Sequence, residues 1–168
     1  LVASMNPSPS GEFYTEDGNH PDSPMDVRRY LRKISGPLLD RIDLHIEVTP
    51  VSFDQMTADR KAEKSSVIRE RVIRAREIQS VRFNEMSDVY SNAMMPSQMV
   101  KKICLTNEAG KTLLKTAMEK LGLSACAYDR ILKVSRTIAD LAGTENIQIE
   151  HLAEAIQYRS LDREGWMG

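Results

Sequence analysis

The side chains best placed to act on a substrate gather in one short stretch, residues 33–48. Arg41 follows Leu-Leu-Asp and stands between Asp40 and Asp43, after the break at Ser35-Gly-Pro37. Functional side chains are often displayed in turns of this kind. Arg41 could instead form a surface pair with Asp40 or Asp43, but such pairs contribute only about 0 to 1 kcal/mol. Stability alone gives little reason for this arginine.

Three further polar or nucleophilic positions stand beside structural signals. Asn6 directly follows the apolar run that begins at Leu1, where it acts either in a site or as a turn former. Cys126 and Arg130 lie one helical turn apart after Ser124, and therefore on nearly the same face. A thiol at a helix start can be reactive, but a packed cysteine is the simpler interpretation. Arg130 equally suits a packing role or a surface ion pair.

Other motifs are weak. Gly110-Lys-Thr112 spells the end of a phosphate-binding loop, but position 105, where the first glycine of that loop belongs, is leucine. His45 and His151 are isolated from other ligands, and the two cysteines, Cys104 and Cys126, form no Cys-x-x-Cys pair. We therefore predict no metal site in this sequence.

Composition limits the class of protein. The 168 residues are 41% hydrophobic, which supports a folded core, and the net charge of −1 gives no global attraction to nucleic acid. Basic groups at 28–33 and 60–82 could follow a nucleic-acid backbone, although no stacking aromatics are interleaved with them and solvated helix faces look the same. The sparse cysteines suit a cytoplasmic protein, and no apolar run is long enough to cross a membrane.

The elements that must position Arg41 can be inferred from the same stretch. Ser23-Pro24 predicts a helix start, and this helix should run to about Lys33 before the break at Gly36-Pro37. Residues 43–48 then alternate strictly between polar and apolar, which predicts a half-covered strand with Leu44, Ile46 and Val48 facing inward. Leu1–Met5 predicts a second, buried strand that begins abruptly, as in the C-terminal piece of a longer protein.

After Pro50 the pattern changes to helices. We expect helices over 58–82, 98–104, 108–121, from Ser124 to about Leu141, and 149–159, with stops at Gly122 and Gly143. Gly18, Asn19 and Pro21 indicate a loop over 12–22, and the tail from Ser160 should fray. The sequence thus predicts the end of an α/β domain in residues 1–50 and an all-helical domain in residues 51–168.

The run Ile34-Ser-Gly-Pro-Leu-Leu-Asp-Arg-Ile-Asp-Leu-His-Ile-Glu-Val48 resembles the last core strand region of the AAA+ ATPases of the magnesium-chelatase subunit I and ComM-like (YifB) family. The MCM helicases carry a looser version of it. The start Leu-Val-Ala-x-Met-Asn-Pro-x-Pro-x-Gly11 and the segment Leu123–Arg130 also resemble this family. By this resemblance, residues 1–50 end a nucleotide-binding core whose phosphate-binding loop lies upstream, and residues 51–168 form its helical lid.

The resemblance implies roles for four residues. Arg41 is the arginine finger, which reaches a nucleotide on the neighbouring subunit, and Asn6 is the sensor 1 residue that positions the attacking water. Cys126 stands where relatives have the sensor 2 arginine and carries no positive charge, whereas Arg130 is placed to substitute for it. Many relatives have cysteines at the positions of Ser8 and Ser10, which suggests a metal knuckle in those proteins. Because this chain has serines there, no zinc is expected.

The resemblance also implies a parent protein that uses ATP and Mg²⁺ and assembles as a homo-oligomeric ring, expected to be a hexamer. Its ComM-like members act on DNA in branch migration during competence, which is the function we favour. Two alternatives remain: an ATPase motor for magnesium insertion into a porphyrin, and a regulatory ring subunit with little turnover. Without the phosphate-binding loop, the chain alone should not hydrolyse ATP.

Overall fold

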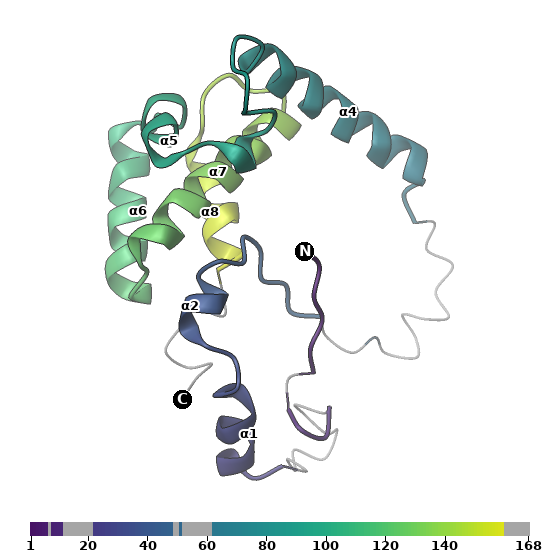
Figure 1. The fold of residues 1–168 in the computed structure, drawn as a ribbon, viewed down its shortest axis with the longest axis vertical. Coiled ribbons are helices and arrows are strands. Elements are labelled where there is room, and N and C mark those ends of the chain that lie inside the picture. Colours follow the sequence, from purple (N-terminus) through teal and green to yellow (C-terminus); the bar gives the residue numbers. More distant parts are fainter. Residues whose placement is uncertain (7, 12–21, 49–50, 52–61, 160–168) are drawn as a thin grey trace.

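The computed structural model describes residues 1–6, 8–11, 22–48, 51 and 62–159, and nearly all the regular structure in them is helical. The elements are α1 (Pro24–Leu31), α2 (Gly36–Leu39), α4 (Ser65–Arg82), the short 3₁₀ helix η1 (Asn92–Met94), α5 (Ser97–Ile103), α6 (Glu108–Leu121), α7 (Ala125–Leu141) and α8 (Ile149–Gln157). Figure 1 shows α4 to α8 gathered at one end of the molecule and α1 at the other.

Side-chain caps fix where three of these helices begin. The side chains of Ser23, Asn107 and Ser124 accept hydrogen bonds from the backbone N–H groups at the starts of α1, α6 and α7. Gly122 ends α6 with φ of +59°, a left-handed conformation that glycine adopts without steric cost. The helices predicted from these signals are confirmed within a few residues of their expected bounds.

The helical domain, α4 to α8, packs around α7. This helix contacts α4, η1, α5 and α8, while α6 packs on α8. The main apolar cluster includes Met95, Val100, Ile131 and Leu152, and every member lies between Phe83 and Ala155. Gly110 is needed at the contact of α6 with α8, because a Cβ there would come within 2.8 Å of Leu152 Cδ1. The glycine of the Gly-Lys-Thr sequence therefore has a packing role.

A buried polar cluster joins α4 to α7. Arg82 Nη2 lies 2.5 Å from Asp140 Oδ1, and Arg136 Nε donates to the same oxygen at 3.1 Å. Asn92 of η1 donates to Asp140 Oδ2 at 2.7 Å. Arg136 also donates to the carbonyl oxygens of Thr144 and Glu145. The carboxylate of Asp140 thus has charged and neutral donors on several sides.

The apolar spacing predicts an inward face of Ile68, Val72, Ala75 and Ile78 in the first long helix, and one of Ala109, Leu113, Ala117 and Leu121 in 108–121. Each face is only partly confirmed. In α4, Ala75 is buried as expected, but Ile68, Val72 and Ile78 are exposed. Only the C-terminal half of α4 packs on the other helices, and it does so through the face of Ala75 and Gln79. Residues 62–64 are not helical, so α4 begins later than expected. In α6, Ala117 is buried as expected, but Gly110 and Leu114 are buried in place of Ala109 and Leu113, although Leu113 is partly covered. The first two turns of α6 therefore bury positions one residue later than expected.

The two predicted strands are not observed as strands. Residues 1–6 and 42–48 belong to no sheet, because a strand needs a neighbour for its backbone hydrogen bonds and no other described segment supplies one. The predicted inward face of 43–48 is also not observed: Leu44, Ile46 and Val48 are 46%, 68% and 86% exposed, and on the opposite face His45 is buried while Asp43 and Glu47 are exposed. The α/β part of the predicted fold is thus not formed among the described residues.

Some expectations lie outside the described residues: most of the predicted loop over 12–22, the first turn of the helix expected from Ala58, and the tail from Ser160. The helix that begins at Pro24 ends before Gly36-Pro37, as predicted. Pro37 itself stands in the first turn of a second, short helix, α2. No helix in the described part of the chain has the length and apolar character required to cross a membrane.

Candidate functional site

Arg41 lies in the turn directly after α2, and its side chain is exposed. The turn is closed by backbone hydrogen bonds: Asp40 N–H donates to the Gly36 carbonyl, and Arg41 N–H donates to the Leu38 carbonyl at 3.0 Å. Pro37 fixes the backbone at the start of α2, and Leu39 is buried beneath the turn. The predicted turn is present, and it presents the guanidinium at the surface.

The acidic neighbours of Arg41 are engaged by other arginines. Asp43 Oδ1 lies 2.5 Å from Arg130 Nη1 of α7. Asp40 Oδ1 lies 3.7 Å from Nη2 of Arg159, which comes just after α8. Each of the two carboxylates that could have paired with Arg41 therefore faces a cation from the helical domain.

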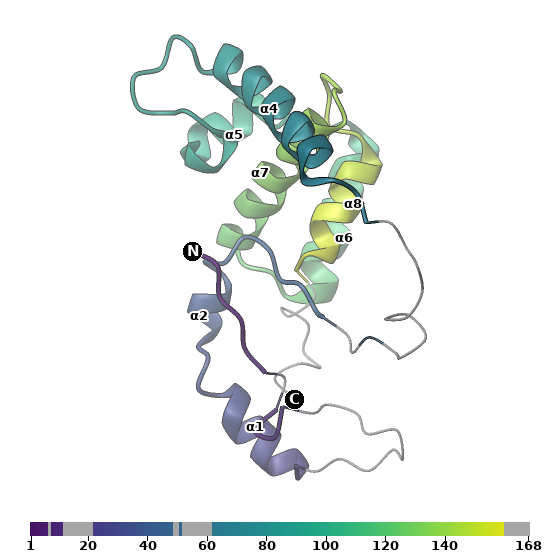
Figure 2. The same cartoon turned by 90° about the vertical axis from the view of Figure 1, so that its right-hand side faces the viewer.

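The backbone after Arg41 is also attached to the helical domain. Ile42 accepts a hydrogen bond at its carbonyl oxygen from Arg159 Nη1. His45 N–H donates to the Tyr158 carbonyl at 2.8 Å, and His45 Nε2 lies 3.3 Å from the Leu39 carbonyl. In Figures 1 and 2, α2 and the segment after it lie beside the end of α8 and the start of α7.

The two predicted residues of α7 have different surroundings. Cys126 is exposed in the first turn of the helix, whereas Arg130, one turn later, is directed to Asp43. A neutral thiol supplies no cation to a phosphate. The four predicted site residues are Asn6, Arg41, Cys126 and Arg130. Through its contact with Asp43, Arg130 lies close to the turn that bears Arg41.

Asn6 is exposed, and its side chain lies beside Gly11. Ser8 and Ser10, at the positions of the expected knuckle, have hydroxyl oxygens 3.1 Å apart, and Ser10 Oγ donates to Asp22 Oδ2 at 2.6 Å. This bond and one from the Ser10 backbone N–H to the same oxygen hold the pKa of the Asp22 carboxyl below its usual value. Two serines that contact each other, one of them bonded to Asp22, therefore stand at these two positions of the knuckle.

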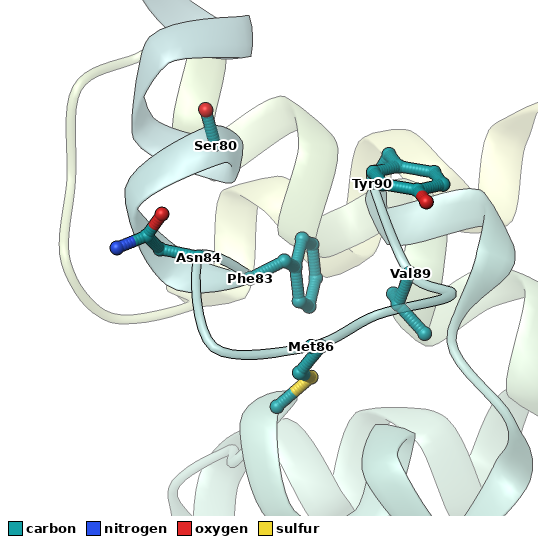
Figure 3. Close-up of a pocket in the computed structure, with 6 residues that line it drawn as sticks. All are labelled: Ser80, Phe83, Asn84, Met86, Val89 and Tyr90. Carbon is teal, nitrogen blue, oxygen red and sulfur yellow. The ribbon is translucent and has the colours of Figure 1, made fainter.

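Two surface pockets among the described residues lie on α4 and the loop after it, away from these positions. A surface pocket of about 190 Å³ lies where α4 meets the next loop, lined by Phe83, Met86, Val89 and three neighbours (Figure 3). It has no charged lining residue and is smaller than the usual ligand site of about 300–1,000 Å³. Nor does any group of three His, Cys, Asp or Glu side chains in the described ranges suit a metal ion.

Sequence reasoning missed Arg159, which is 1% exposed despite its charge. Its partner Ile42 is 117 positions away, and a backbone carbonyl leaves no mark on the sequence. One signal was available: Arg159 ends a helical pattern in which positions three and four residues earlier, Ile156 and Ala155, offer it no acidic partner. That pattern alone does not identify its contacts.

Two family models match nearly the whole chain. Residues 62–159 match the family described as magnesium chelatase, subunit ChlI C-terminal, and residues 1–56 match magnesium chelatase, subunit ChlI. The chain belongs to the magnesium chelatase subunit ChlI family. Its helical domain corresponds to the first match, and the turn with Arg41 lies within the second.

Several curated relatives are similar along nearly the whole chain. It is 48% identical to competence protein ComM of Haemophilus influenzae over 165 residues, covering 97% of this chain and 31% of that relative. It is 39% identical to the uncharacterized protein YifB of Escherichia coli and 32% identical to an uncharacterized protein of Mycobacterium bovis, with 97% and 95% of this chain covered and 31% of each relative. The chain thus spans about a third of the length of these ChlI-family relatives.

Proposed function

We propose that this chain is the C-terminal part of an AAA+ ATPase that forms a ring and uses ATP hydrolysis to remodel DNA. Membership in the ChlI family supports an ATPase, and the likeness to a protein named competence protein ComM supports a DNA substrate. One structural observation carries the proposal. Arg41 has an exposed guanidinium in a closed turn, while Asp40 and Asp43 face Arg159 and Arg130.

In this proposal, Arg41 binds the phosphates of a nucleotide held by the neighbouring subunit. Bound ATP supplies the phosphoryl group, and the guanidinium neutralises negative charge that develops on this group during transfer. An arginine supplied from a second subunit can raise the rate by roughly 10³ to 10⁵. The turn fits this role because Arg41 is free of the ion pairs that its neighbours make, within the part of the chain described.

The other proposed site residues contribute less in this chain. Asn6, exposed before the Ser8–Ser10 loop, would orient the attacking water. Cys126 stands at the sensor 2 position, where its thiol offers no charge to the nucleotide of its own subunit, and Arg130 is paired with Asp43. The described residues offer no acidic cluster for Mg²⁺, so no step is assigned to a metal here.

The test is the ATPase activity of the full-length protein, measured with and without DNA, for wild type and Arg41→Ala. We expect DNA to stimulate hydrolysis and Arg41→Ala to lower kcat by about 10³-fold or more. Lys115→Ala, which removes an exposed cation of α6, is the matched control and should retain the wild-type rate. In rings that contain both wild-type and Arg41→Ala subunits, each variant subunit should inactivate the ATP site of the subunit next to it.

The outcomes separate the candidate functions. Hydrolysis that responds only to chelatase partner subunits would instead assign the protein to metal insertion. A wild-type protein with no turnover under any condition would make it a regulatory ring subunit. Normal turnover by Arg41→Ala would exclude the proposed role of that arginine.

A further inference from the structure

The turn that bears Arg41 is attached to the helical domain on both sides of that residue. Before Arg41, Asp40 lies near Arg159; after it, Ile42 accepts a hydrogen bond from Arg159 and Asp43 pairs with Arg130. The backbone of His45 is bonded to Tyr158. We call these contacts of Arg130, Tyr158 and Arg159 with residues 40–45 the clamp.

Arg159 is the central member of the clamp. Its guanidinium is almost fully buried, and burying an arginine costs several kcal/mol unless hydrogen bonds and a countercharge compensate for it. The turn supplies it with both kinds of partner: the Ile42 carbonyl and the Asp40 carboxylate. Arg159 stands beyond the end of α8 and outside the main apolar cluster, which closes at Ala155. These contacts therefore serve the turn more than the core.

The second attachment reaches the helix that carries the sensor 2 position. Arg130 Nη1 lies 2.5 Å from Asp43 Oδ1, and Cys126 is one turn earlier on the same helix. A displacement of the first turns of α7 would thus pull on Asp43, two residues from Arg41. In the proposed function, the start of α7 faces the nucleotide of its own subunit, and Arg41 acts on the nucleotide of the neighbouring subunit. The clamp connects these two parts of the chain.

We propose that Arg159 is a positioning residue for Arg41 and that, through the clamp, the turn at 40–43 moves with the helical domain as one unit. This inference rests on the proposed function of Arg41. Arg159 does not touch the nucleotide; it donates to the Ile42 carbonyl after Arg41 and lies 3.7 Å from the Asp40 carboxylate before it. A misplacement of about 1 Å at a reacting group can lower a rate by about 10²-fold, so loss of this support should reduce turnover strongly.

The first test measures the clamp itself by hydrogen exchange in the full-length protein. In Arg159→Ala, the His45 amide should exchange about tenfold faster or more, because the turn separates from Tyr158, while amides of α6 and α7 keep their protection. Arg159→Lys keeps the positive charge but lacks the planar guanidinium that can donate to two partners at once, so the exchange rate of the His45 amide should be intermediate. Unchanged protection of His45 in Arg159→Ala would overturn the clamp. Lys115→Ala is the control.

The second test is a double-mutant cycle on ATP hydrolysis with Arg41→Ala, Arg159→Ala and the combined variant. Arg159→Ala should lower kcat by about 10- to 100-fold and leave the KM for ATP within about twofold. In the Arg41→Ala background it should cause no further loss, because it acts through Arg41. Equal losses in both backgrounds would show that Arg159 acts independently of Arg41 and would overturn the inference.

The two proposals fail in different ways. If Arg41→Ala leaves kcat unchanged, the proposed function is rejected, and the catalytic part of this inference with it. If Arg41→Ala abolishes turnover but Arg159→Ala does not reduce it, only the inference is rejected. If Arg159→Ala lowers the melting temperature of the whole protein, Arg130→Gln is used in its place in both tests. This variant removes only the ion pair of Arg130 with Asp43, and the expected directions are the same.

Discussion

At the scale of single residues, the site depends on which charges are already paired. Asp40 and Asp43 flank Arg41 in the sequence, and a local pair with either of them is the alternative to a functional role. The structure instead supplies Arg159 and Arg130 from far along the chain. The exposed position of Arg41 could be predicted from the break at Gly36-Pro37. The partners of Asp43 and Asp40 could not, because these contacts span 87 and 119 positions of the chain.

The two cysteines differ in their surroundings, and one of them gives a pH prediction. Burial raises the pKa of the Cys104 thiol to about 11, against the opposing effect of Arg136 and Arg82. The unfolded chain ionises this thiol near its ordinary value of 9.0, so the folded state holds more protons between these values. The associated stability is fully present below about pH 9 and is lost as the pH rises through about 11.

Cys104→Ala should therefore show a smaller fall in the free energy of unfolding between about pH 9 and pH 11 than wild type. The difference should be on the order of 2 kcal/mol, since one pKa unit corresponds to about 1.4 kcal/mol. Urea unfolding at several alkaline pH values measures it. Cys126→Ala, at an exposed position, is the control, and parallel curves for Cys104→Ala and wild type would contradict the prediction.

At the scale of elements, the Asp140 cluster fixes α4 on α7. The carboxylate is fully buried and accepts hydrogen bonds from Arg82, Asn92 and Arg136. Replacing it with alanine leaves two guanidinium groups without their countercharge in a buried place. Removal of one partner from a buried ion pair typically costs about 3–5 kcal/mol.

Asp140→Ala should accordingly lower the melting temperature of the chain by about 10 °C or more. Circular dichroism during heating measures this shift. Lys115→Ala breaks only an exposed i, i+4 contact and should change the stability by less than about 0.5 kcal/mol. Equal melting temperatures for Asp140→Ala and this control would show that the cluster does not anchor α4.

Helix starts were the most predictable part of the fold because their signals are local. Ser23, Asn107 and Ser124 cap their helices with their own side chains, and Gly122 ends α6. The apolar face of α4 was not predictable, because whether Ile68 meets a neighbour depends on how far the helical domain extends. The alternation in 43–48 is typical of a strand, yet pairing requires a second segment that periodicity does not provide.

At the scale of the whole molecule, stability is concentrated in the helical domain. The members of the main apolar cluster all lie between Phe83 and Ala155, whereas the described residues of 1–51 contribute Leu31 and Leu39 to the buried apolar residues. The contacts between the two regions at the clamp are mainly polar. The helical domain should therefore not depend on residues 1–51 to fold.

A chain of residues 62–159 should fold alone, with a cooperative thermal transition within about 10 °C of that of the 168-residue chain. Circular dichroism gives both the helical content and the transition. Residues 1–51 are the reciprocal control and should show little helix, because α1 and α2 have eight and four residues, fewer than isolated helices need. A broad, gradual loss of signal from 62–159 would contradict this division.

The uneven burial of α4 has a mechanical consequence. Its 18 residues span about 27 Å, and they are held at one end by Ala75, Gln79 and Arg82 while the other end reaches into solvent (Figure 1). A rotation of about 10° at the held end would sweep the free tip through about 5 Å, from the length of such a rod. Small rotations of α4 that leave the packing around Asp140 intact would thus produce larger displacements at its N-terminal end.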